Sequence, residues 1–158
     1  MESQAADPRI RETPQDVYKK LYKMTMVGAA AFWLTNFAIS RTSIAAEYGA
    51  ALSISYLPMI VESLIGGLII GFSVSYLLLR FFDDIPTKNP ILKSVMLSLI
   101  ALIIVTILLE GPARFLTMGD ASRYFLIGAL FNVLRILALG MAIGYLHDKL
   151  QREASVKR

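Results

Sequence analysis

The chain has 158 residues, of which 56% are hydrophobic and only 18% are charged. Soluble domains average about 45–50% apolar and about 25% charged residues, so this composition is typical of a chain that lies largely in hydrocarbon. The chain has no cysteine and a single histidine, His147, which excludes disulfides, thiolate metal sites and sites built from several histidines. We therefore expect no metal and no cofactor.

Residues 1–23 are polar and are predicted to form a cytoplasmic amino-terminal tail. Pro8 and Pro14 favour a flexible segment up to residue 16, and a helix is expected to begin within residues 15–23 and lead into the following apolar stretch. Four acidic residues precede that stretch, unlike the short basic start of a cleaved signal peptide. A retained helix is therefore expected.

Four stretches are long and apolar enough to span a membrane as helices, which takes about 20 mostly apolar residues each. They cover residues 24–40, 56–79, 91–109 and 124–146. The outer loop over residues 41–55 is only mildly polar and is expected to hold a short helix along the membrane surface. The predicted fold class is an all-α integral membrane protein, a bundle of four transmembrane helices over residues 24–146. A basic cytoplasmic tail over residues 147–158 is expected to follow the bundle.

The positions of lysine and arginine predict the orientation of these helices, because cytoplasmic loops carry an excess of both. Twelve lie in the amino-terminal segment, the loop over residues 80–93 and the carboxyl-terminal tail, against three in the two opposite loops. Both termini are therefore predicted to be cytoplasmic, in a multi-pass protein of the cell membrane. The same distribution accounts for the formal net charge of +4 without a nucleic-acid partner.

Glu62 and Arg135 are the charged residues that we predict to lie within the membrane. Glu62 is about 6–9 Å from the outer end of its helix, and Arg135 is near mid-membrane, at about 1.5 Å of rise per residue. Charged side chains at such depths are costly and normally face a partner or a cavity. We predict a Glu62–Arg135 ion pair bridged by Asn132, which shares a helix face with Arg135. The pair is either a structural link between helices or a site where the carboxylate exchanges a proton or cation.

Small residues recur every four positions on two of the predicted helices. Such rows let helix backbones approach closely and pack by dispersion. We expect them to pack helices within the chain, and the alternative is an interface between chains. The residues are Ser63, Gly67, Gly71 and Ser75 on the second helix and Gly140 and Gly144 on the fourth.

The second and fourth predicted helices also share a short pattern that suggests an internal duplication. Residues 71–77 (GFSVSYL) align with residues 140–146 (GMAIGYL). Parallel repeats of helical hairpins occur in some transporter folds. The alternative is that glycine, small residues and a terminal tyrosine are simply common in membrane helices.

Charged residues flank the predicted outer side of the membrane. Salt bridges at the rim account for them, and such exposed pairs contribute little energy. The alternative is the vestibule of a substrate path. These residues are Arg41, Glu47, Glu110 and Arg114, with Arg123 nearby.

No phosphate loop, paired-histidine zinc helix, nucleophile elbow or dinucleotide fingerprint occurs, so we predict that the chain is not an enzyme. Two functions stay open. The first is a subunit, assembly factor or scaffold component of a larger membrane complex, with the lipid bilayer and other membrane-protein chains as partners. The alternative is a small homo-oligomeric transporter or channel with Glu62, Ser73, Asn132 and Arg135 along a polar path. We favour the first, because these polar residues are few for a path across the whole bilayer.

Overall fold

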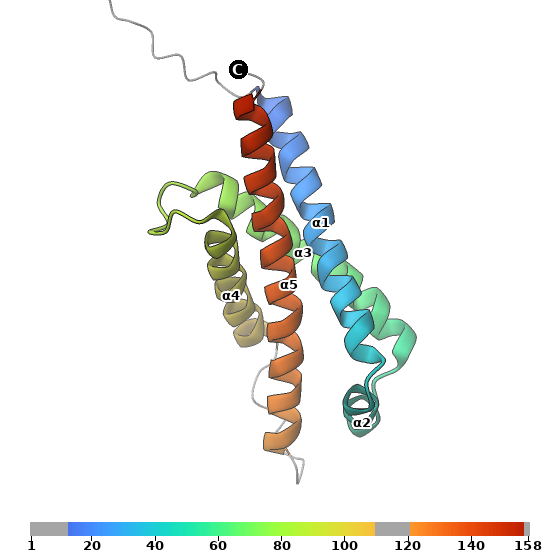
Figure 1. The fold of residues 1–158 in the computed structure, drawn as a ribbon. Coiled ribbons are helices and arrows are strands. Elements are labelled where there is room, and N and C mark those ends of the chain that lie inside the picture. Colours follow the sequence, from blue (N-terminus) through green and yellow to red (C-terminus); the bar gives the residue numbers. More distant parts are fainter. Residues whose placement is uncertain (1–12, 110–120, 157–158) are drawn as a thin grey trace, which may run out of the picture.

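The computed structural model describes residues 13–109 and 121–156, and within them all regular structure is helical. Five helices follow one another along this part of the chain, without a strand (Figure 1). They are α1 (Pro14–Ser40), α2 (Ser43–Ala51), α3 (Tyr56–Arg80), α4 (Pro90–Leu109) and α5 (Ala121–Val156). The all-helical prediction is therefore confirmed for the described residues.

The first helix, α1, begins ten residues before the predicted apolar stretch. Thr13 is its N-cap, since the hydroxyl accepts a hydrogen bond from the Asp16 backbone N–H at 3.3 Å, and Pro14 occupies the first turn. The helix then continues without a break to Ser40. The expected lead-in helix and the first apolar stretch are thus one element of 27 residues.

The short helix expected in the loop over residues 41–55 is present as α2. Thr42 caps it, because its hydroxyl accepts a hydrogen bond from the Ala45 backbone N–H at 3.2 Å. The chain then turns back toward α3 through Ser53, which has a left-handed backbone with φ of 53°. α2 itself packs against α1 and α5.

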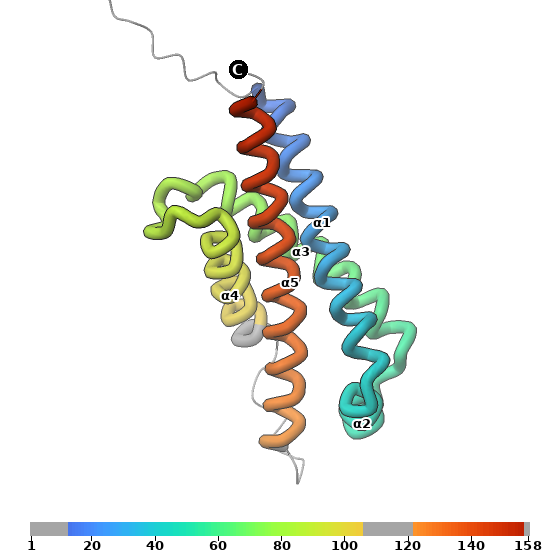
Figure 2. The backbone as a smooth tube through the Cα atoms, viewed as in Figure 1, coloured from blue at the N-terminus to red at the C-terminus, as the bar shows by residue number. Residues whose placement is uncertain are grey.

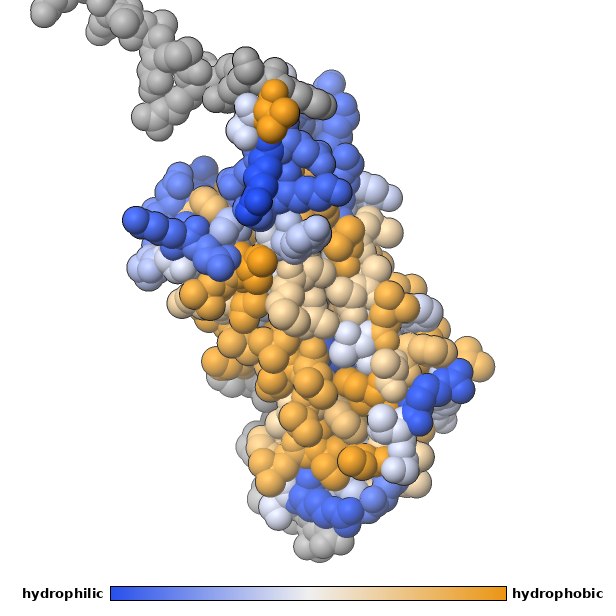
Figure 3. All heavy atoms as spheres, in the orientation of Figure 1, coloured by the Kyte–Doolittle hydropathy of each residue, from blue (hydrophilic) through white to orange (hydrophobic). Residues whose placement is uncertain are grey.

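Two helices are long and apolar enough to cross a membrane, namely Tyr56–Arg80 and Ser122–Val156. Only 22% and 28% of their most apolar windows are buried within the molecule, whereas the core helix of a soluble protein would be mostly buried. Figure 3 shows polar residues at both ends of the visible face and apolar residues over most of the surface between them. The structure thus shows an all-helical arrangement with two helices that could cross a membrane, and it does not confirm the bundle of four transmembrane helices that the sequence predicts.

The core lies where α1, α3 and α5 meet. α1 packs along both α3 and α5, and α4 packs along α5, whereas α3 and α5 hardly touch (Figures 1 and 2). The start of α1 and the end of α5 lie at the same end of the molecule (Figure 1). The buried core residues are Met24, Phe32, Val74, Leu78, Ile136, Leu139 and Ile143.

The small-residue face of α3 lies against α1. A Cβ added at Gly71 would lie 3.1 Å from the Thr25 carbonyl oxygen, and one added at Gly67 would lie 3.3 Å from the Ala29 carbonyl oxygen. The two helix backbones therefore approach as closely as glycine allows. The same face carries two further buried small residues, Ser63 and Ser75.

The glycines of α5 pack in the same way against α4. A Cβ added at Gly140 would lie 3.0 Å from the Val95 Cα, and one added at Gly144 would lie 2.5 Å from the Ile91 Cα. Gly71 and Gly140 align in the pattern that residues 71–77 and 140–146 share. Gly71 lies where α3 packs against α1, and Gly140 lies where α5 packs against α4. This arrangement is what two copies of a helical hairpin would give.

The fifth helix continues past residue 146, where the sequence analysis ends the bundle. It runs to Val156, so most of the predicted carboxyl-terminal tail is helical. Two i,i+4 ion pairs favour this extension: Asp148 with Arg152 at 2.9 Å and Lys149 with Glu153 at 4.0 Å. Hydropathy marks only the apolar part of a helix, which is why its polar continuation was predicted as a separate tail.

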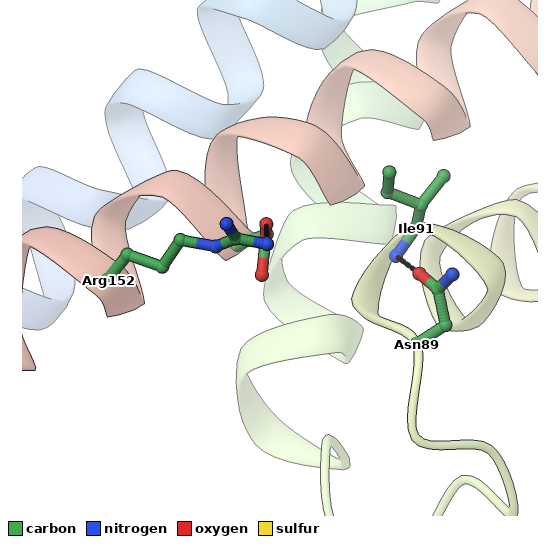
Figure 4. A network of polar contacts seen from close by, with 4 residues as sticks. Asn89, Ile91 and Arg152 are labelled. Atoms are coloured by element: carbon green, nitrogen blue, oxygen red, sulfur yellow. Dashed lines mark hydrogen bonds and ion pairs between the residues drawn. The ribbon is translucent and has the colours of Figure 1, made fainter.

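The start of α4 lies beside this extension of α5. The Asn89 side-chain oxygen accepts a hydrogen bond from the Ile91 backbone N–H at 2.9 Å and so caps α4, with Arg152 on α5 close by (Figure 4). Lys93 is buried, donates a hydrogen bond to the Phe82 carbonyl oxygen, and lies 3.8 Å from the centre of the Phe82 ring. The Lys93 side chain is thus held by the loop between α3 and α4.

Candidate functional site

A cavity of about 640 Å³ lies between α1, α2, α3 and α5, at the end of the molecule away from the start of α1 and the end of α5. Ligand pockets in proteins typically measure about 300–1,000 Å³. The cavity forms because α3 and α5 each pack on α1 and hardly contact one another. Its main polar lining consists of Asn36, Tyr48, Glu62, Ser63, Asn132 and Arg135.

Three of the four intramembrane residues singled out from the sequence line this cavity. Glu62 lies in the second turn of α3 and is exposed, while Asn132 and Arg135 lie one turn apart on α5. The Arg135 Nη1 donates a hydrogen bond to the Asn132 side-chain oxygen at 3.3 Å. Spacing of i and i+3 on one helix places these two side chains on the same face.

The predicted Glu62–Arg135 ion pair is not confirmed. Both side chains line the cavity, but no ion pair joins them within residues 13–109 and 121–156. The Arg135 guanidinium instead donates to Asn132 on its own helix. The structure thus gathers the two opposite charges around one cavity without closing the pair.

Ser73, the fourth intramembrane candidate, does not line the cavity. It lies about 16 Å further along α3 than Glu62 at 1.5 Å of rise per residue. Its hydroxyl donates a hydrogen bond to the Ile69 carbonyl oxygen at 2.9 Å, which satisfies it within the helix. The cavity therefore occupies one end of the molecule and does not follow α3 through its length.

Asn36 on α1 is a cavity residue that the sequence analysis missed. Its side chain is 1% exposed, and neither the amide nitrogen nor the amide oxygen makes a hydrogen bond within the described part of the chain. Nearly all buried polar groups in proteins have such a partner, so each exception requires an explanation. The available signal was an asparagine inside a predicted span, where side-chain amides usually bond across helices.

The short helix α2 covers the cavity and is held onto α5. Arg123 at the start of α5 forms an ion pair with Glu47 on α2 at 2.8 Å. The Tyr48 ring meets the Phe131 ring edge-on, with 5.7 Å between ring centres, and lies 6.4 Å from the Tyr124 ring. These contacts join α2 to α5 beside the cavity.

The other outer-rim candidates are distributed as follows. Arg41 stacks over the Phe37 ring, with 4.6 Å from the guanidinium carbon to the ring centre. Both side chains of the Arg123–Glu47 pair are about half exposed, so the pair contributes about 0–1 kcal/mol. Glu110 and Arg114 lie outside the described residues.

Comparison with protein-family models, with curated proteins and with solved structures finds no match for this chain. In the described ranges, no three histidine, cysteine, aspartate or glutamate side chains gather in a way that would hold a metal ion. Among the described residues, the cavity lining offers one carboxylate, one guanidinium, two side-chain amides and several hydroxyls.

Proposed function

We propose that the chain is a small multi-pass membrane protein that takes up a polar ligand in its outer half, as a small transporter or channel subunit does. The observation that carries this proposal is the cavity that Glu62, Asn132 and Arg135 line together with Asn36, whose buried amide makes no hydrogen bond within the described residues. Ligand sites combine a mostly apolar wall with a few convergent polar groups. This cavity has both.

The membrane assignment has three supports. Two helices are long and apolar enough to span a bilayer, and their apolar windows are mostly exposed. Within α4, the stretch Pro90–Val105 is a shorter apolar helix, and α4 packs along α5. Both ends of the described chain lie at one end of the molecule, as an even number of spans requires (Figure 1). We propose four spans, α1, α3, α4 and α5, with both termini in the cytoplasm.

The small-residue faces favour ligand uptake over the scaffold role that the sequence analysis preferred. A scaffold would use its glycine faces to bind other chains. Here Gly67 and Gly71 are covered by α1, and Gly140 and Gly144 are covered by α4. These faces are occupied within the chain, while the polar cavity has no such internal use.

Native mass spectrometry of the protein extracted gently from its own membrane tests this function. We expect a monomer or homo-oligomer that retains a small molecule. The Glu62→Gln variant should assemble equally well and lose that molecule. Glu153→Gln, an exposed change at the opposite end of the molecule, should retain it. If no small molecule is retained and Glu62→Gln behaves like the control, the cavity has no ligand and the proposal is wrong.

A second candidate, a subunit of a larger membrane complex, is favoured by one position on α3. A Cβ added at Gly66 would meet nothing within 4 Å, and the exposed Ile65 and Ile69 lie beside it. An open glycine on an apolar face is what a neighbouring membrane helix packs against. An unrelated larger protein in fixed stoichiometry, released by Gly66→Leu, would establish this function.

A further inference from the structure

We infer that one end of the molecule binds the headgroups of anionic phospholipids. This inference goes beyond the proposed uptake of a ligand and rests on the proposed placement of the chain in a membrane. It follows from three features of that end: a band of exposed tyrosines, a band of exposed basic residues beyond the tyrosines, and a surplus of positive charge.

The start of α1 and the ends of α3 and α5 lie at the same end of the molecule. On α3, Gly67 approaches Ala29 of α1, and the later Gly71 approaches Thr25, which comes earlier in α1. The two helices are therefore antiparallel, and α3 ends at the end of the molecule where α1 starts. α5 also ends there (Figure 1). We call this end, which holds residues 14–23, 76–93 and 145–156, the basic end.

Exposed tyrosines form a band just inside the basic end. A Cβ added at Gly28 would lie 2.7 Å from the Ile143 side chain, and one added at Gly71 would lie 3.8 Å from the Gly28 carbonyl carbon, so these residues mark one level across three helices. At about 1.5 Å of rise per residue, the tyrosines lie about 3–9 Å from that level toward the basic end. Tyrosine is enriched where a membrane meets water, so the band marks this boundary. The tyrosines are Tyr22 on α1, Tyr76 on α3 and Tyr145 on α5, all exposed.

A band of exposed basic residues lies outside the tyrosines. On each of the three helices, one such residue lies three or four positions beyond the tyrosine, which is about 9–14 Å from the common level. Long basic side chains at this position extend along the apolar surface and place their charge at the headgroups. The residues are Lys19 on α1, Arg80 on α3 and Lys149 on α5, with the exposed Lys23 next to Tyr22.

Three of these four cations make no ion pair within residues 13–109 and 121–156. They are Lys19, Lys23 and Arg80, whereas Lys149 lies 4.0 Å from Glu153. Exposed charges without a carboxylate at contact distance can donate to a phosphate without first breaking a pair. The phosphate of a lipid headgroup is the anion that a membrane presents at this level.

The charge balance of the two ends favours anionic lipids over zwitterionic ones. Among the described residues, the basic end carries eight lysines and arginines against five acidic residues, and the opposite end carries three against two. Figure 3 shows hydrophilic residues gathered over the basic end. A basic cluster next to membrane-spanning helices attracts anionic lipids, whereas a zwitterionic headgroup has no net charge to attract. The partner that this surface fits is therefore an anionic phospholipid.

Native mass spectrometry of the full chain released from nanodiscs of equal parts phosphatidylglycerol and phosphatidylcholine tests the inference. We expect the natural chain to retain at least about fivefold more phosphatidylglycerol than phosphatidylcholine, as for one basic residue near the membrane surface. The variant with Lys19→Gln, Lys23→Gln and Arg80→Gln should bring this ratio close to one. All three positions are exposed, so the variant keeps the fold.

Two controls separate charge at the basic end from other effects. Arg41→Gln, which removes an exposed arginine at the opposite end, should leave the lipid ratio unchanged. Lys19→Arg with Lys23→Arg keeps both charges and should also leave it unchanged. Equal retention of the two lipids by the natural chain, or an unchanged ratio in the glutamine variant, overturns the inference and leaves the proposed ligand uptake intact, since none of these residues lines the cavity. A chain that does not insert into the nanodiscs overturns both.

Discussion

Replacing Asn36 by leucine tests whether the asparagine side chain serves ligand binding or the stability of the fold. Leucine is close in size to asparagine and has no polar side-chain atoms. We expect the Asn36→Leu variant to be more stable than the natural chain and to lose the small molecule that the proposed function expects in native mass spectra. A gain in stability combined with a loss of binding identifies a residue retained for function.

The size of the stability gain follows from the burial of the amide. Asn36 is 1% exposed, and its nitrogen and oxygen make no hydrogen bond within the described residues. An unsatisfied buried polar group costs about 1–3 kcal/mol, and the better helix propensity of leucine adds less than about 0.7 kcal/mol. We therefore expect a gain of about 1–3 kcal/mol. For a chain of this size, that raises the unfolding temperature by roughly 2–12 °C.

Thermal unfolding in detergent, followed by tryptophan fluorescence, measures this gain. Trp33 is the only tryptophan in the chain and lies on α1, one turn before Asn36. The matched control is Asn89→Leu. There the side-chain oxygen accepts a hydrogen bond from the Ile91 backbone N–H at 2.9 Å and caps α4, so the same substitution should cost about 0.5–2 kcal/mol.

The two substitutions are expected to change the unfolding temperature in opposite directions. A general effect of added hydrophobicity therefore cannot explain both results. If Asn36→Leu lowers the unfolding temperature, its amide stabilises the fold and our account of its burial is wrong. If the variant is stabilised and still retains that small molecule as fully as the natural chain does, Asn36 is not part of the ligand site. Only the combination of stabilisation and lost binding supports the reasoning.

The remaining predictions concern helix packing and pH. Both Gly144→Ala and Gly71→Ala should unfold at a lower temperature than the natural chain, and Gly144→Ala at the lowest. The reason is that the added Cβ would lie 2.5 Å from a neighbouring backbone atom at Gly144 and 3.1 Å from one at Gly71. Any other order of unfolding temperatures contradicts the packing. Gly66→Ala, with nothing within 4 Å, should gain about 0.5–1 kcal/mol. The Thr13 hydroxyl donates to Asp16 and lowers its pKa below 3.8. The stabilisation of the first turn of α1 by this hydrogen bond is therefore present above pH 3.8 and is lost as the pH falls through the lowered pKa of Asp16. Amide hydrogen exchange should show that this turn frays over the same pH range. The Thr13→Val variant should show no such change with pH.

The sequence was sufficient to predict an all-helical chain, but it misplaced two helix ends. Hydropathy marks where a helix is apolar, whereas α1 begins in a polar segment and α5 ends in one. The local chemistry of those ends was readable: Thr13 and Pro14 form a helix start, and Asp148 with Arg152 forms an i,i+4 pair. Helix caps and charge spacing therefore carried information that an apolar window discards.

Features of the candidate site that lie on one helix could be predicted from the sequence, whereas features that depend on the packing of several helices could not. The contact between Asn132 and Arg135 follows from their spacing on α5. That Asn36 is buried without hydrogen-bond partners depends on how α1 packs against its neighbours, and a single neutral amide hardly changes the hydropathy of a span. No property of the sequence alone gives the burial of that amide.

The predicted Glu62–Arg135 pair shows why the depth of two residues along their helices was insufficient to predict a contact between them. Position along a helix fixes how far a residue lies from the membrane surface, but not how far apart two helices stand. α3 and α5 both pack on α1 and hardly touch, so the cavity occupies the space where the pair was predicted to close.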